Sequence, residues 1–164
     1  LNGPVNNGTG CMASTQVGFE CMIVLVPGTV VLHYNADALT NTLDLRLEVS
    51  TNGWVGMGLS PSGGMVGARV ILASTSVTPA PYSLTAKSLA GVNQNDEAID
   101  ATNIEFLNDG GTSFLTYTLT SEDLATVSQS ISSMKLRATS YSILVCVWNR
   151  ISVLSSVTIH RLLH

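Results

Sequence analysis

The chain has 164 residues, the size of one domain and enough to bury the core of a β-sandwich. Its net charge of −4, with seven Lys and Arg residues that never cluster, argues against nucleic acid as a partner. Only 11% of the residues are charged, against about 25% in an average protein, and Ser, Thr, Asn and Gly are abundant. This composition suits a secreted β-protein, and no run of about 18 apolar residues predicts a membrane-spanning helix.

The first 18 residues are rich in Gly, Asn, Ser and Thr and show no periodicity, so they predict an amino-terminal arm before a single domain over residues 19–164. The chain begins at Leu1 without a charged and then apolar leader, so we expect a mature secreted or cell-surface form. The only N-glycosylation sequon begins at Asn7 and agrees with that location. Three cysteines allow at most one internal disulfide. Without Cys-x-x-Cys, covalent heme attachment is excluded and a zinc-thiolate site is disfavoured.

The first half of the chain predicts three strands before its glycine-rich centre. An apolar segment, residues 19–26, ends at the turn dipeptide Pro27-Gly28 and is followed by a β-branched strand over residues 29–34. Residues 43–49 alternate strictly between aliphatic and charged side chains. This alternation predicts a strand with one buried face and one solvated face, so its Asp, Arg and Glu are not read as a catalytic set.

A hairpin rich in glycine follows. The turn dipeptide Asn52-Gly53 leads into a short strand, which breaks after Ser60, and a second apolar strand covers residues 69–73. Met65 lies between these strands, beside Gly64 and two residues before Gly67. A methionine in this setting either fills an irregular gap in a core or presents its soft sulfur to a ligand.

The second half predicts further strands and few helical turns. Two prolines between residues 75 and 81 predict a turn, and residues 82–86 a short strand. Residues 108–111, Asn-Asp-Gly-Gly, predict a hairpin turn before an alternating strand over residues 113–119. A continuous apolar run over residues 142–148 and a β-branched run over residues 152–159 complete the chain. Roughly eight to ten short strands without helical periodicity indicate an all-β antiparallel sandwich.

Enzymatic signatures are missing from the sequence. There is no Gly-x-Ser-x-Gly motif, no phosphate-binding loop and no convincing pair of acids for glycoside hydrolysis. The three histidines are His33, His160 and His164. We interpret His33 as a strand histidine with a satisfied hydrogen bond, because it lies within an apolar strand. Hydrolase chemistry is therefore disfavoured, and no catalytic residue is assigned.

The segment Gly53-Trp54-Val55, a Pro/Gly turn, Gly63-x-Met65-x-Gly67 and an apolar strand resembles the signature of DOMON domains. These are extracellular, immunoglobulin-like β-sandwich modules, found in the cytochrome domain of cellobiose dehydrogenase and in plant auxin-induced cytochromes. The resemblance covers most of the chain and is strongest over about twenty-five residues around Met65. It also relates Cys11 and Cys21 to the paired cysteines of plant members, while Cys146 either stays a buried thiol or pairs with the amino-terminal segment.

Heme-binding DOMON members hold iron between a methionine and a histidine near the domain end. The resemblance therefore implies non-covalent heme b, with iron ligated by Met65 and His160, and His164 as the competing histidine. It implies a cofactor pocket that includes these ligands and the side chains of Trp54, Met57, Tyr34 and Trp148, where Met57 is either pocket wall or core. A six-coordinate Met/His iron transfers single electrons and leaves no position for a substrate, so we expect an electron-transfer domain rather than a stand-alone catalyst.

The expected partner is a redox protein or a membrane reductase domain. The alternative is a non-heme DOMON sandwich that binds carbohydrate, or assembles by self-association as a structural or adhesion module.

Overall fold

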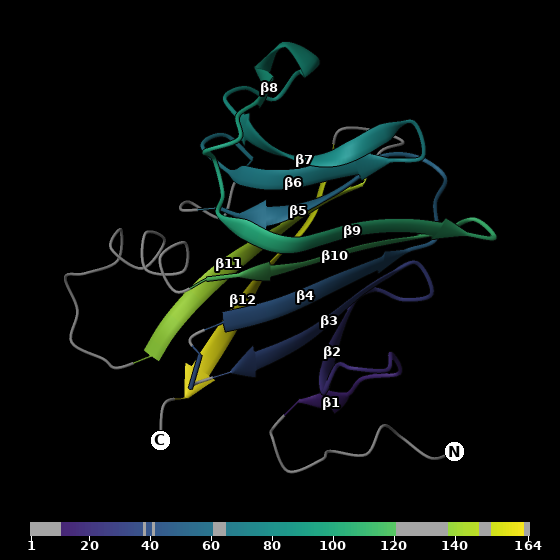
Figure 1. The fold of residues 1–164 in the computed structure, drawn as a ribbon, viewed down its shortest axis with the longest axis vertical. Helices are drawn as coiled ribbons and strands as arrows, with labels where there is room; N and C mark the ends of the chain where they lie inside the picture. The colour runs from purple at the N-terminus through teal and green to yellow at the C-terminus, as the bar shows by residue number, and fades with distance from the viewer. Residues whose placement is uncertain are drawn as a thin grey trace.

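The computed structural model describes residues 11–37, 39–40, 42–60, 65–120, 138–147 and 152–162, the last two ranges as backbone alone. Within these ranges the protein consists of two antiparallel six-stranded sheets that pack face to face as a β-sandwich (Figure 1). No helix in the described part of the chain is long and apolar enough to cross a membrane. The all-β antiparallel sandwich expected from the sequence is confirmed at this level.

The first sheet has the strand order β1-β2-β3-β4-β10-β9. Its strands are β1 (Met12–Ala13), β2 (Cys21–Val26), β3 (Val30–Asp37), β4 (Thr42–Val49), β10 (Thr112–Leu119) and β9 (Ala101–Asp109). The second sheet has the order β12-β11-β5-β6-β7-β8. Its strands are β12 (Ser152–Leu162), β11 (Ala138–Val147), β5 (Val55–Leu59), β6 (Arg69–Ser74), β7 (Val77–Leu84) and β8 (Val92–Gln94), which follows a single 3-10 turn, η1 (Leu89–Gly91).

The alternation in β4 and β10 forms the centre of the first sheet. These strands pair so that Leu47 lies opposite Leu115 and Leu45 opposite Tyr117, and all four side chains are fully buried. Burying one aliphatic side chain of this size contributes roughly 1.5–3 kcal/mol to folding. The charged residues between them point to the other face of the sheet, as the alternation predicted.

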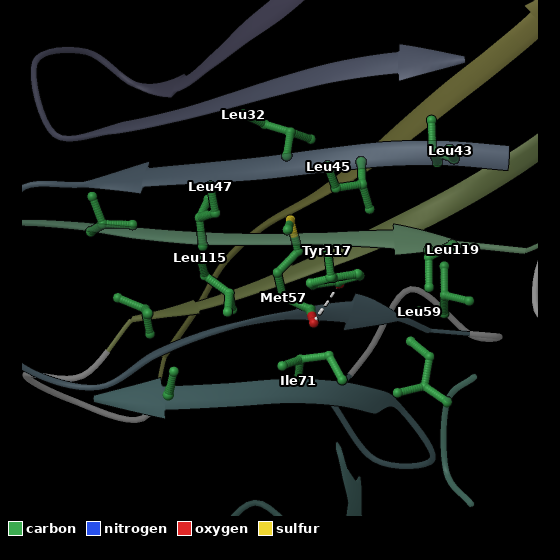
Figure 2. Packing of buried hydrophobic residues seen from close by; sticks show 14 of the residues in the cluster. Leu32, Leu43, Leu45, Leu47, Met57, Leu59, Ile71, Leu115, Tyr117 and Leu119 are labelled. Atoms are coloured by element: carbon green, nitrogen blue, oxygen red, sulfur yellow. Dashed lines mark hydrogen bonds between the residues drawn. The ribbon is translucent and has the colours of Figure 1, made fainter. Parts of the chain in front are cut away.

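The core between the sheets is completed by residues of the second sheet. Met57 and Leu59 of β5 and Ile71 of β6 are fully buried against the leucines of β4 and β10 (Figure 2). The apolar run in β6 is buried on both sides, because Ile71 and Ala73 belong to this core while Val70 and Leu72 belong to a separate cluster.

The turn predicted over residues 75–81 is confirmed only for its first two residues. The chain turns at Thr75 and Ser76, and β7 runs through both prolines. The Pro81 carbonyl accepts a hydrogen bond from the Asn95 backbone N–H. The carbonyl of Pro81 therefore points away from β6. The N–H that proline lacks would face the same way, so the pairing of Pro81 with Ile71 loses no hydrogen bond.

A disulfide joins Cys11 to Cys21, with 5.6 Å between their Cα atoms. This confirms the pairing implied by the DOMON resemblance, and it rules out a bond from Cys146 to either cysteine. We call residues 11–21 the disulfide loop. It contains β1, which pairs with the start of β2, so residues 11–18 of the expected arm belong to the first sheet and its surface. Residues 1–10 of the arm lie outside the described residues.

Tyr117 links the two sheets. Its hydroxyl is buried and donates a hydrogen bond to the Met57 carbonyl, with 2.7 Å between the oxygens (Figure 2). Replacing Tyr117 by phenylalanine leaves that buried carbonyl without this donor, so we expect a loss of about 1–2 kcal/mol in the free energy of unfolding, measured by urea denaturation. Tyr82→Phe is the control, because the Tyr82 hydroxyl has no hydrogen bond among the described residues. Equal losses in the two variants would contradict the prediction.

Candidate functional site

A second apolar cluster lies on the face of the β6–β7 sheet that is turned away from the main core. We call it the outer cluster; its buried members are Met65, Ala68, Val70, Leu72 and Leu84, with Trp54, Tyr82 and Val92 packed against them. The Met65 side chain is 7% exposed, so its sulfur lies in apolar surroundings. The packing agrees with the view that Met65 fills a gap, and it is also the environment that an apolar cofactor edge requires.

Three backbone hydrogen bonds hold Met65 beside the end of β7. The Gly67 N–H donates to the Leu84 carbonyl at 2.7 Å, and the Leu84 N–H donates to the Ala68 carbonyl at 2.9 Å. The Ala68 N–H donates to the Met65 carbonyl at 3.1 Å, which closes a tight turn. Gly67 has a φ of +85°, a conformation that favours glycine, so the glycine after Met65 is needed for this turn.

The backbone of His160 lies near the end of β12, opposite Ser140 of β11. The last pair between β11 and β5 is Ile143 with Leu59, so His160 lies three positions beyond the end of β5. The chain between β5 and β6, which contains Met65, leaves the sheet at this same end. Alternation along β11 gives Ser140 and its partner His160 register positions on the same sheet face as Gly58.

Two strands, β5 and β11, separate β6 from β12, which corresponds to about 14 Å between the outer two backbones. Figure 1 shows β11 and β12 running obliquely to β5. The end of β12 is therefore separated from the Met65 segment by β5 and β11, and Figure 1 shows the β12 arrowhead beside the end of β3, away from β6.

The other expected pocket residues divide between the two faces of the second sheet. Trp54 packs against the outer cluster and is brought together with Met65. Met57 and Tyr34 belong to the main core between the sheets, so they are not brought to Met65. Trp148 and His164 lie outside the described residues.

His33 is the centre of a polar network that the sequence did not reveal. Its ring is fully buried, with Nδ1 2.8 Å from the Ser14 hydroxyl and Nε2 3.2 Å from a Glu48 carboxylate oxygen. The Gln16 side-chain amide donates to the same oxygen at 3.0 Å. The prediction that His33 is a strand histidine with a satisfied hydrogen bond is confirmed. Only the pairing of β3 with β4 and the path of the disulfide loop bring Ser14 and Glu48 to it.

The direction of these hydrogen bonds follows from the chemistry of the partners. A carboxylate can only accept, so Nε2 carries the proton that faces Glu48, and Nδ1 of the neutral ring accepts from Ser14. Burial lowers the pKa of His33 below its ordinary value of 6.5 and outweighs the opposing effect of Glu48, so the ring is neutral near pH 7.

A serine, a histidine and a carboxylate in line invite comparison with a hydrolase triad. In a triad the histidine must pass its proton to the leaving group of the substrate, so its edge must be accessible. The His33 ring has no exposed surface, and the Ser14 hydroxyl also accepts the Gln16 backbone N–H at 3.0 Å. The network therefore anchors the disulfide loop and does not form a nucleophilic site.

Within the described part of the chain, no group of three or more His, Cys, Asp or Glu side chains gathers as a metal centre would require. A search against protein-family models found no match to this chain. The outer cluster around Met65 is thus the candidate functional site, since it places a methionine side chain in an apolar enclosure.

Proposed function

We propose that this protein is an extracellular b-type cytochrome domain of the immunoglobulin-like DOMON type, which transfers single electrons. The observation that supports the proposal most directly is the enclosure of Met65 in the outer cluster, in a turn that Gly67 shapes. His160, whose backbone pairs with Ser140 near the end of β12, would supply the second donor.

The residues present fit a non-covalent heme in their donor chemistry. Met65 would bind iron through its thioether sulfur, and His160 through an imidazole nitrogen. When bound, the heme supplies reversible one-electron exchange. Trp54, which is only partly buried against the cluster, would contact the apolar part of the ring and exclude water from it. Met57 and Tyr34, which the sequence assigned to the pocket, would support β5 and β3 from the main core instead.

A thioether ligand favours the reduced iron and raises the reduction potential, while an apolar enclosure disfavours the extra charge of the oxidised form. The protein would accept an electron from a redox protein or membrane reductase and pass it on. Six-coordinate iron leaves no position for substrate, so catalysis is not part of the proposal.

The test uses two methionines of one hairpin on opposite faces of the same sheet. Met65→Leu and Met57→Leu keep a similar side-chain volume, and both variants are mixed with hemin and reduced with dithionite. We expect wild type and Met57→Leu to show the sharp α and β bands of a low-spin His/Met cytochrome, and Met65→Leu to lose them. His160→Ala is expected to lose them as well.

Two results would overturn parts of the proposal. A wild-type protein that remains colourless after incubation with hemin rules out the cytochrome. An unchanged spectrum in His160→Ala, with a changed spectrum in Met65→Leu, assigns the second ligand to His164.

A second candidate, a carbohydrate-binding sandwich, is favoured by the solvent-facing side of the first sheet. There the Arg46 guanidinium stacks over the Phe114 ring, 4.6 Å from its centroid, and Thr118 donates a hydrogen bond to Asp44 at 2.6 Å. A sugar would have to displace the Arg46 guanidinium to stack on this ring, with the polar groups beside it as hydrogen-bond partners. Isothermal titration with oligosaccharides, and loss of binding in Phe114→Ala, would support this candidate over the cytochrome.

A further inference from the structure

The disulfide loop lies across the outward face of the first sheet and is held there by hydrogen bonds to side chains of β3 and β4. Asn35 donates to the Gly18 carbonyl and accepts from the Glu20 backbone N–H, both at 2.6 Å. Glu48 accepts from Gln16, and His33 accepts from Ser14. Each of these hydrogen bonds joins a loop residue to β3 or β4, so the loop is held by polar contacts with the sheet as well as by its disulfide.

His33 is the only one of these sheet residues that is fully buried and can change its charge near neutral pH. The Phe19 ring of the loop lies 6.4 Å from the His33 ring, centroid to centroid, and helps to cover it. The loop therefore removes water from an imidazole that would otherwise be solvated. Covering a neutral ring costs little, whereas covering an imidazolium costs its hydration.

We propose that the disulfide loop is a proton-released latch, docked on the first sheet while His33 is neutral and released when His33 takes up a proton. Release does not open the chain, because the Cys11–Cys21 bond keeps both ends of the loop beside β2. It uncovers His33, Asn35 and Glu48 as a polar surface next to β2. This inference concerns the first sheet and is independent of the proposed heme.

The direction of the pH effect follows from linkage. The docked state lowers the pKa of His33, so the undocked state binds more protons. Docking is complete above the ordinary value of 6.5 and weakens as the pH falls from there toward the pKa of the docked state. For each unit by which docking lowers the pKa of His33, the docking equilibrium in acid is tenfold weaker than at neutral pH.

Few charged groups near His33 contribute to this balance. Among the described residues packed against it, β4 carries Glu48, which raises the pKa of His33, and Arg46, which lowers it. The loop carries Glu20, whose backbone is held by Asn35, and β2 carries no charged residue. Glu48 and Arg46 therefore offer two substitutions with opposite effects.

The experiment measures amide hydrogen exchange of residues 12–20 by mass spectrometry between about pH 7.5 and about pH 5, corrected for the intrinsic rate. We expect protection of the loop to fall as the pH is lowered across this range, while β4 stays protected. His33→Gln removes the titration and should abolish the pH step. Glu48→Gln should deepen the fall, because it lowers the pKa of the docked His33 further, and Arg46→Gln should reduce it.

Protection of the loop that stays constant with pH would overturn the latch. A pH step that persists in His33→Gln would also overturn it, since another group would then control the loop. A fall in protection that changes in the same direction in Glu48→Gln and Arg46→Gln would show that the charges around His33 are not responsible. Ser14→Ala serves as a positive control, because loss of its hydrogen bond to His33 should lower the protection of the loop at every pH.

Discussion

Replacing Gly58 by alanine is expected to destabilise the protein by roughly 3 kcal/mol or more, because the new methyl group has no space. A Cβ at this position would collide with the Arg69 carbonyl oxygen and lie 2.5 Å from the Val70 Cα, and both are backbone atoms of β6. Backbone in the middle of a sheet cannot move aside as a flexible side chain can. The strands β5 and β6 would have to separate, which would disturb both faces of the second sheet.

The measurement is urea denaturation followed by circular dichroism, with Gly28→Ala as the matched control. Gly28 has a φ of +70° in the turn before β3, and no atom lies within 4 Å of the position that its new methyl group would take. Only backbone strain is therefore added there, about 1–2 kcal/mol. A Gly58→Ala variant as stable as Gly28→Ala would contradict the close approach of β5 to β6.

Replacing Leu45 by alanine is expected to lower the free energy of unfolding by roughly 2–5 kcal/mol. Leu45 is fully buried, between Tyr34 on one neighbouring strand and Tyr117 on the other. The large rings cannot collapse into the space that the leucine leaves, so the cavity persists and adds its own cost to the lost burial.

Leu107→Ala is the control, because Leu107 lies on β9 of the same sheet and is 55% exposed. The free energy of unfolding of Leu107→Ala should fall by no more than about 0.5 kcal/mol. The free energy of unfolding of both variants is measured by urea denaturation. The slope of that free energy against urea concentration should stay the same as in the wild type. Similar losses at Leu45 and Leu107 would mean that β4 does not face the core.

The strands with strict alternation could be predicted from the sequence alone. In β4 and β10 the polarity of each residue predicts the sheet face on which it lies, because side chains alternate across a strand and only one face is apolar. The turn between β9 and β10 could be predicted as well, since Gly110 and Gly111 both adopt a positive φ that glycine permits. These are local signals and need no knowledge of neighbouring strands.

The prolines of β7 led to a wrong prediction because their effect depends on a neighbour. Proline breaks a ladder only where its missing N–H would face the next strand, and at Pro81 that edge faces away from β6. The sequence shows a proline, but it does not show to which neighbouring strand the missing N–H would point.

The two methionines of the hairpin illustrate the same limit at the candidate site. Local backbone preferences and periodicity were enough to predict the glycine turn around Met65 and the β-sandwich class. They could not show that Met57 enters the main core and Met65 the outer cluster, or that Ser14, His33 and Glu48 meet. Those placements depend on strand pairing and register, which join residues far apart in the chain and so assign each side chain its face and its partners.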